Sequence, residues 1–211
     1  MSATCIGVLA LQGAFSSHRF HLEFLGVQML EVRDAETLTH CDALILPGGE
    51  SSTMLEHIDR ARLVEPLATY CARRPVWGIC AGAILLARSV RSPPQVSLGV
   101  LDIEVERNGY GRQLESFVET IHGFSVSFIR APRIRRVGQA VQIRHRVAGV
   151  PVWVEHGDRM ATSFHPELSR DRVSPWHRQL VRRAVARLRP RKAMGDGVGP
   201  EARAAWLRRR P

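Results

Sequence analysis

Short apolar runs alternate with amphipathic stretches along the first half of the chain. Four runs rich in aliphatic residues have the length of buried strands: 5–11, 27–32, 43–46 and 76–79. Three intervening stretches repeat their apolar residues at helical spacing: 17–25, 53–70 and 81–90. Pro66 either breaks the second of these helices or begins a new one. This alternation predicts an α/β fold with a doubly wound, mostly parallel sheet and helices on both faces.

The pattern changes after residue 94, where strand-like runs follow one another without helices between them. They comprise residues 98–106, 117–122, 125–129, 141–145 and 152–155. We expect them to form an antiparallel extension in the second half of the chain. A returning strand at 160–164 and a closing amphipathic helix at 176–188 follow. The predicted domain spans residues 1–188, and we expect the basic tail at 189–211, rich in Pro, Gly, Ala and Arg, to be disordered.

The charge of the chain is unevenly distributed. Its 211 residues suit a single domain, and the formal net charge is +10. Residues 1–169 hold 17 basic and 17 acidic side chains, whereas residues 170–211 hold 13 and 3. A neutral body argues against nucleic acid as the main partner, although the Arg-rich tail leaves a nucleic-acid-binding module as an alternative.

The four cysteines are irregularly spaced and form no Cys-x-x-Cys pair. This spacing argues against a disulfide framework or a zinc site and favours a reducing compartment, so we predict a cytoplasmic protein. No apolar run is long enough to span a bilayer, and the first residues lack the pattern of a secretory signal. We therefore expect no membrane association.

Residues 78–82, Gly-Ile-Cys-Ala-Gly, place Cys80 where a predicted strand turns into a predicted helix. Flanking glycines allow the tight turn of a nucleophile elbow, here with Cys in place of Ser. A helix N-terminus favours the thiolate, which is the nucleophilic form of cysteine. The alternative is a small buried residue in an Ala/Gly-rich helix start, and this motif alone does not decide between them.

His165 and Glu167 follow the predicted strand at 160–164. In an extended chain, residues i and i+2 face the same side, and Pro166 favours an extended conformation at His165. Glu167 is therefore placed to fix the tautomer of the imidazole, as the third member of a triad does. Taken alone, the pair favours a surface His and Glu, but with Cys80 it completes a Cys-His-Glu set.

Residues 47–51, Pro-Gly-Gly-Glu-Ser, follow the buried run at 43–46, where α/β sheets bind ligands. The backbone N–H of Gly49, together with that of Ala81, would form an oxyanion hole. A tight turn followed by a helix cap explains the same residues in isolation.

Together these motifs resemble the triad-type (class I) glutamine amidotransferases. Further stretches are similar to one branch of that family, the glutaminase subunits of pyridoxal 5′-phosphate synthase: 9–15, 50–54, 106–108 with 111–113, and 128–132. The match runs from about residue 6 to residue 168. Because separate motifs occur in the same order, the resemblance is specific, and it implies a flavodoxin-like fold.

The resemblance implies that the chain hydrolyses L-glutamine to glutamate and ammonia. The ammonia would pass to a partner synthase subunit, in a hetero-oligomeric complex that makes pyridoxal 5′-phosphate (vitamin B6). It further implies that this subunit holds no metal and no cofactor of its own, and that its activity depends on docking to the synthase.

The resemblance also assigns roles to residues. Cys80 would attack the amide carbon, His165 would protonate the leaving ammonia, and Glu167 would orient His165. Gly49 and Ala81 would hold the oxyanion. The residues implied in binding L-glutamine are Gly49, Glu50, Ser51, Arg107, Ile129 and Arg130.

Three departures from the family pattern stand out, and one of them is the tail at 189–211, for which the family offers no counterpart. The connection between Phe117 and Phe128 is shorter, which leaves the strand pairing there and the approach to Arg130 open. Gly109 and Tyr110 replace the small residue and Phe that usually follow Arg-Asn. The alternatives are a catalytically impaired regulatory subunit of the same fold and a thiol hydrolase that acts on another amide.

Overall fold

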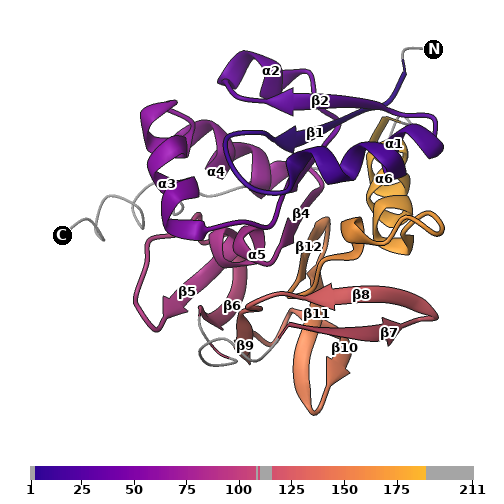
Figure 1. Ribbon diagram of the computed structural model, residues 1–211. Coiled ribbons are helices and arrows are strands. Elements are labelled where there is room, and N and C mark those ends of the chain that lie inside the picture. The colour runs from indigo at the N-terminus through magenta and orange to yellow at the C-terminus, as the bar shows by residue number, and fades with distance from the viewer. Residues whose placement is uncertain (1–2, 108, 110–115, 189–211) are drawn as a thin grey trace.

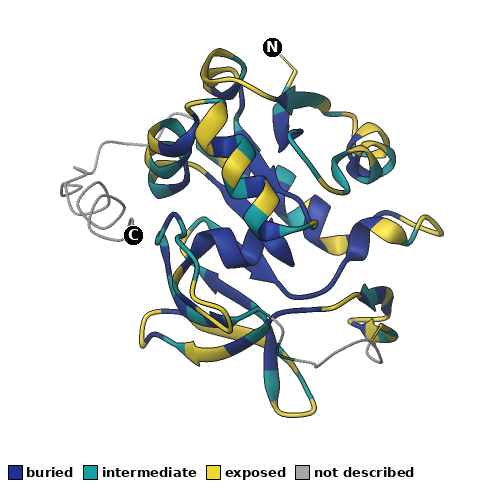
Figure 2. Cartoon of the chain, turned by 60° about the vertical axis from the view of Figure 1, so that its left-hand side comes forward, coloured by how far each residue is buried: buried dark blue, intermediate teal, exposed yellow. Residues whose placement is uncertain are grey.

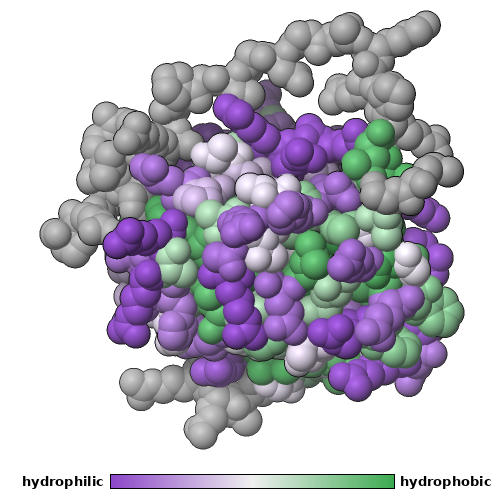
Figure 3. All heavy atoms as spheres, turned by 90° about the horizontal axis from the view of Figure 1, so that it is seen from above, coloured by the Kyte–Doolittle hydropathy of each residue, from purple (hydrophilic) through white to green (hydrophobic). Residues whose placement is uncertain are grey.

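The computed structural model describes residues 3–107, 109 and 116–188. The predicted tail at 189–211, Tyr110 and part of the stretch at 106–113 lie outside the described residues. Within the described part of the chain, no helix has both the length and the apolar character needed to cross a membrane. Hydrophilic side chains cover much of the face shown in Figure 3, with hydrophobic ones set between them. Such a mixture is typical of an exposed protein surface.

A seven-stranded sheet forms the centre of the molecule, in the order β10-β11-β12-β4-β3-β1-β2 (Figure 1). Its strands are β1 (Cys5–Leu9), β2 (Gln28–Val32), β3 (Ala43–Leu46), β4 (Val76–Ile79), β10 (Gln142–Val147), β11 (Val150–His156) and β12 (Arg159–Thr162). Strands β2, β1, β3, β4 and β12 pair in parallel, whereas β11 is antiparallel to both β12 and β10. The predicted doubly wound, mostly parallel sheet with an antiparallel extension is confirmed.

Helices cover both faces because the central strands send alternate side chains to opposite sides. On one face, α1 (Arg19–Phe24) and α6 (Pro175–Leu188) pack against Ala43 and Ile45. On the other face, Leu44 and Leu46 meet residues of four helices: α2 (Ala35–Thr39), α3 (Ser51–Arg60), α4 (Val64–Arg73) and α5 (Ala81–Leu86). Figure 2 shows the buried residues concentrated in the central strands and α5, with exposed residues along the outer sides of the other helices.

Two smaller sheets complete the second half. Strands β5 (Ala87–Arg91), β6 (Leu101–Glu106) and β9 (Arg133–Val137) form one, and the antiparallel pair β7 (Phe117–Ile121) and β8 (Phe124–Phe128) forms the other. The residues that link β7 to β8, His122 and Gly123, have φ values of 51° and 70°. Two residues with positive φ are what a tight hairpin turn requires. The short connection noted in the sequence therefore makes a regular hairpin.

Three predictions of elements need correction. The helix predicted at 81–90 ends at Leu86, because the next five residues pair with β6 as strand β5. The break expected near Pro66 in the helix predicted at 53–70 occurs earlier, at residues 61–63, where Arg62 has a φ of 55°. Pro66 is the third residue of α4, where its missing N–H costs no helical hydrogen bond, so it neither breaks nor begins the helix. Helix α2 and strand β9 were not predicted.

Candidate active site

Three neighbouring parallel strands bring three motifs to one edge of the central sheet. Strands β12, β4 and β3 adjoin in that order. The loop after β3 carries residues 47–50, the turn after β4 carries Cys80, and the segment after β12 carries His165. The carboxyl ends of parallel strands are where α/β proteins bind ligands.

Cys80 joins β4 to α5 through a strained turn. Its φ and ψ are 49° and −103°, a conformation that residues other than glycine rarely adopt. Its N–H donates to the carbonyl of Thr162 at 2.8 Å, which ties the turn to β12. Cys80 as a residue is 7% exposed, and its Sγ lies 4.0 Å from the backbone oxygen of Ile129. A turn of this kind presents a nucleophile at the top of the sheet.

The two glycines of the elbow allow α5 to approach the sheet closely. A Cβ on Gly78 would lie 2.5 Å from the backbone oxygen of Gly82. A Cβ on Gly82 would lie 2.0 Å from the backbone oxygen of Leu46. Both distances are far below van der Waals contact, so neither position accepts a side chain without movement of the backbone.

His165 is held by its side chain and its backbone. Its Nδ1 lies 2.7 Å from Oε1 of Glu167, on the short helix η2 (Pro166–Leu168), and both side chains are buried. Its N–H donates to the carbonyl of Ser127 at 2.7 Å, so the β7–β8 hairpin anchors the histidine. The imidazole also interacts with Cys80, toward which Nε2 remains available.

His165 and Glu167 stabilise the charged form of each other. Burial by itself lowers the pKa of His165, but hydrogen bonds and negative charge from Cys80 and Glu167 raise it overall to about 10. Burial by itself raises the pKa of Glu167, but the hydrogen bond and the charge of His165 lower it overall. His165 therefore holds its proton near neutral pH while Glu167 is ionised.

Gly48 and Gly49 form the loop that faces the imidazole. A Cβ on Gly48 would lie 2.2 Å from Cε1 and 2.8 Å from Nδ1 of His165. A Cβ on Gly49 would lie 2.4 Å from Oε1 of Gln12. The absence of both side chains therefore lets this loop pass directly between the imidazole and residues 12–14.

Residues 12–14 brace that loop, a role that the sequence did not reveal. The N–H of Ala14 donates to the carbonyl of Gly48 at 3.0 Å, and the N–H of Glu50 donates to Oε1 of Gln12 at 3.2 Å. Gly13 has a φ of 90°, and a Cβ there would lie 2.0 Å from the Gly48 oxygen. The resemblance of residues 9–15 to the family motif singled out this segment, but it did not indicate which residues the segment contacts.

A small pocket of about 80 Å³ opens beside the cysteine. Its lining consists of Gly49, Glu50, Ser51, Cys80, Ile84, Arg107, Ile129 and Arg130. All six residues that the resemblance implies in glutamine binding thus lie together. Ala81 is the first residue of α5, directly after Cys80. Ser51 is held by a hydrogen bond from its Oγ to Oε1 of Gln95 at 2.9 Å, a partner that the sequence did not indicate.

Glu50 and Arg107 form the charged wall of the pocket. Nη2 of Arg107 lies 2.9 Å from Oε1 of Glu50 and 2.7 Å from Oγ of Ser52. Burial raises the pKa of Glu50, but hydrogen bonds from the N–H groups of Thr53 and Ser52 lower it overall to about 2. The Glu50 carboxylate is thus ionised and caps α3. A guanidinium has five N–H donors, so Arg107 retains donors for a second carboxylate.

Comparison with known proteins identifies the family. The SNO glutamine amidotransferase family matches residues 8–185. The chain belongs to this family. The pyridoxal 5′-phosphate synthase subunit PdxT of Koribacter versatilis (strain Ellin345) is 45% identical over 184 residues, covering 84% of this chain and 95% of that protein. The PdxT of Frankia alni is 46% identical over 191 residues, covering 86% and 95%.

Two solved structures are similar to this chain, the first in sequence and fold and the second in fold. A crystal structure of a glutamine amidotransferase is similar with a TM-score of 0.78 and 41% identity, covering 85% of this chain and 98% of that one. The structure of PurLQS from Thermotoga maritima has a TM-score of 0.60 at 16% identity, covering 89% and 100%, and shares the fold alone. The fold and the family expected from the motifs are confirmed.

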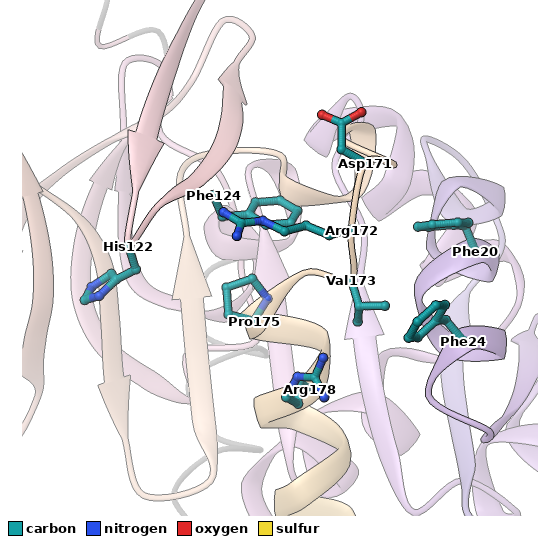
Figure 4. A pocket seen from close by; sticks show the side chains of 9 residues that line it. All are labelled: Phe20, Phe24, His122, Phe124, Asp171, Arg172, Val173, Pro175 and Arg178. Atoms are coloured by element: carbon teal, nitrogen blue, oxygen red, sulfur yellow. The ribbon is translucent and has the colours of Figure 1, made fainter.

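A larger hollow of about 460 Å³ lies apart from the SNO-family motifs (Figure 4). Phe20 and Phe24 of α1 line one side of it. Opposite them, the guanidinium of Arg172 lies over the ring of Phe124, 5.5 Å from its centroid. The lining of this hollow includes no Cys or Ser.

Proposed function

We propose that this chain hydrolyses L-glutamine to glutamate and ammonia through Cys80, His165 and Glu167. The observation that carries the proposal is the buried His165–Glu167 pair, 2.7 Å apart, next to a cysteine on a strained turn. Membership of a glutamine amidotransferase family supports the choice of substrate. The pocket beside Cys80 has the size for a small side-chain group rather than for a polymer.

The first half of the proposed reaction releases ammonia. The thiolate of Cys80 attacks the amide carbon, and the carbonyl oxygen becomes an oxyanion held by the N–H groups of Gly49 and Ala81. When this intermediate collapses, the C–N bond breaks and the proton of His165 passes to the leaving nitrogen. Ammonia departs, a thioester joins the glutamyl group to Cys80, and His165 is left neutral.

The second half regenerates the enzyme. Neutral His165 takes a proton from a water molecule, whose oxygen attacks the thioester carbon. The C–S bond then breaks, glutamate leaves, and the thiolate of Cys80 again faces a protonated imidazole. Throughout, Glu167 accepts the N–H of His165 at Nδ1, which keeps Nε2 directed at the reacting atoms.

Substrate recognition is assigned to the pocket wall. Arg107 and Arg130 are the cations there, and an arginine fork is suited to the α-carboxylate of glutamine. The ionised Glu50 is suited to the α-ammonium group. Gly49, Ser51 and Ile129 complete the surface around the side chain of the substrate.

The ammonia is proposed to pass to a synthase subunit that makes pyridoxal 5′-phosphate. This part rests on the similar proteins, which are named as PdxT subunits of pyridoxal 5′-phosphate synthase. We further propose that docking of the synthase subunit sets the loop at Gly48 and Gly49 and thereby activates hydrolysis. Equal activity with and without the synthase subunit would refute the proposed activation by docking.

The test is release of glutamate from L-glutamine by the purified protein, alone and with its cognate synthase subunit. Cys80→Ala should abolish release in both conditions, because it removes the nucleophile and little packing volume. Cys5→Ser is the matched control, since that thiol lies on β1 outside the pocket, and it should retain activity. Release that persists in Cys80→Ala would refute the assigned mechanism. No release by the wild type in either condition would favour a regulatory subunit that has lost turnover.

A further inference from the structure

Gln95 contacts the wall of the pocket from a loop that the proposed reaction does not use. This loop, residues 92–100, joins β5 to β6. Oε1 of Gln95 accepts a hydrogen bond from Oγ of Ser51 at 2.9 Å. Ser51 is the first residue of α3, is buried, and lines the pocket beside Cys80. Gln95 lies behind Ser51 rather than among the described residues of the lining, so its influence on a bound molecule passes through Ser51.

The side-chain amide of Gln95 has one hydrogen-bond partner in the part of the chain that the structure describes. Its oxygen is held by Ser51, whereas its nitrogen is buried and bonds to none of the described residues. The loop is fastened by another contact, in which Oγ of Ser97 donates to the carbonyl of Ala87 at 2.7 Å. Gln95 is therefore not needed to fasten the loop, and its hydrogen bond fixes the orientation of the Ser51 hydroxyl.

That orientation determines what the Ser51 oxygen can bind. A serine hydroxyl has one proton to donate and two lone pairs that accept. The proton of Ser51 is donated to Gln95, so the lone pairs alone remain for another group. A group that donates, such as an ammonium, suits this oxygen, whereas a carboxylate has no proton to donate and is repelled by the lone pairs.

The charged groups of the pocket match this division between acceptors and donors. Glu50, which directly precedes Ser51, is ionised and is a second acceptor. Its carboxylate accepts the N–H groups of the second and third residues of α3, so these donors at the start of the helix are not open to an anion. The donors of the pocket wall are the guanidinium groups of Arg107 and Arg130, which suit a carboxylate.

We propose that Gln95 is a positioning residue that makes Ser51 selective for the α-ammonium group of L-glutamine. By taking the proton of the Ser51 hydroxyl, Gln95 leaves that oxygen as an acceptor on the residue that follows Glu50. The inference rests on the proposed function and deepens it, because it names the part of the substrate that the Ser51 oxygen recognises. Gln95 itself touches no atom of the substrate and acts only through Ser51.

The test compares two substitutions of Gln95. Gln95→Met has a similar length but no amide, so the Ser51 proton is released and can turn toward the pocket. Gln95→Glu keeps an oxygen that accepts and has no N–H that donates, so it holds the Ser51 proton as Gln95 does. Ser97→Ala is the matched control, because it removes a hydrogen bond of the same loop whose acceptor, Ala87, lies outside the pocket lining.

The first readout is the Kd of L-glutamine, measured by isothermal titration calorimetry at pH 7 on the full-length protein with its synthase subunit. Every variant also carries Cys80→Ala, so that bound glutamine is not consumed. Gln95→Met should raise this Kd about fivefold, because the Ser51 oxygen loses its fixed orientation. Gln95→Glu should bind glutamine at least as tightly as the parent protein. Ser97→Ala should lower Tm and leave the Kd within about twofold of that of the parent.

The second readout repeats the titration with glutaramate, which is glutamine without its α-ammonium group. Gln95→Met should change the Kd of glutaramate by less than about twofold, because the proposed contact is absent. A merely structural role of Gln95 would instead weaken the binding of both ligands equally. Ser51→Ala removes the accepting oxygen and should raise the Kd of glutamine about tenfold. Adding Gln95→Met to Ser51→Ala should raise it no further.

The outcomes separate this inference from the proposed function. An equal loss for glutamine and glutaramate in Gln95→Met, a loss as large in Gln95→Glu, or additive effects of Ser51→Ala and Gln95→Met would overturn the inference. With Cys80 restored, Gln95→Met should raise KM for glutamate release and leave kcat nearly unchanged. If the wild type released no glutamate while the pattern of Kd values held, the proposed hydrolysis would fail and the role of Gln95 would stand. No binding of glutamine to the Cys80→Ala protein would overturn both.

Discussion

Replacing Gly48 by alanine tests the geometry of the site most directly. The new Cβ would lie 2.2 Å from Cε1 of His165, whereas 3.4 Å is the lower end of ordinary contact. The imidazole would have to retreat by about 1 Å. It cannot do so freely, because Glu167 holds Nδ1 at 2.7 Å and Ser127 holds the backbone N–H at 2.7 Å.

The expected loss is large for so small a change. A displacement of about 1 Å in a catalytic group lowers the rate on the order of 10²-fold. Overpacking of this kind also lowers the free energy of unfolding by about 1–3 kcal/mol. The φ of Gly48 is not in the left-handed region, so backbone strain does not add to these effects.

The assay is glutamate release in the presence of the synthase subunit, with Tm measured on the same preparations. Gly149→Ala serves as the control: it introduces strain at a φ of 78° but meets no atom within 4 Å. That control should lose stability and keep kcat/KM. If Gly48→Ala retained turnover within about twofold of the wild type, the imidazole would not be confined as the structure indicates.

Three further substitutions probe other parts of the site. Glu167→Gln removes the charge that helps to raise the pKa of His165 to about 10, so the descending limb of the pH–rate profile should move to lower pH by about 1–3 units; an unmoved limb would contradict this. Gly82→Ala places a Cβ 2.0 Å from the backbone oxygen of Leu46 and should lower the free energy of unfolding by about 1–3 kcal/mol, measured in urea. Arg107→Lys loses the planar fork and should raise KM for glutamine about tenfold with kcat nearly unchanged, whereas an equal fall in kcat would assign Arg107 to the transition state.

Buried strands were the most predictable part of the fold. The apolar runs at 43–46 and 76–79 coincide with β3 and β4, because strands covered on both faces must be apolar throughout. Strand β5 was mistaken for helix, since the apolar run from 81 to 90 contains no local signal at which helix gives way to strand. Its pairing with β6, later in the chain, decides the conformation. Strand β9 is rich in arginine and has no alternating apolar pattern.

The region of the candidate site also has a part that the sequence predicted and a part that it did not. Cys80, His165 and Glu167 could be proposed as a catalytic set from the sequence, because uncommon residue types stand at positions that such chemistry requires. The contact between His18 and His177 joins residues 159 positions apart. A single histidine in an amphipathic helix resembles any other polar position, so only packing of the short helix η1 (Phe15–His18) against α6 reveals the pair.

One hairpin links the pocket beside Cys80 to the imidazole of His165. Ser127 of β8 pairs with the backbone of His165, and the chain then continues directly to Ile129 and Arg130 in the pocket wall. The φ of 43° at Arg130 turns the chain there, two residues after the strand ends. The regular register of β7 against β8 therefore sets the histidine and the pocket wall together. A two-residue turn suffices for this purpose, because only the β8 end of the hairpin reaches the site.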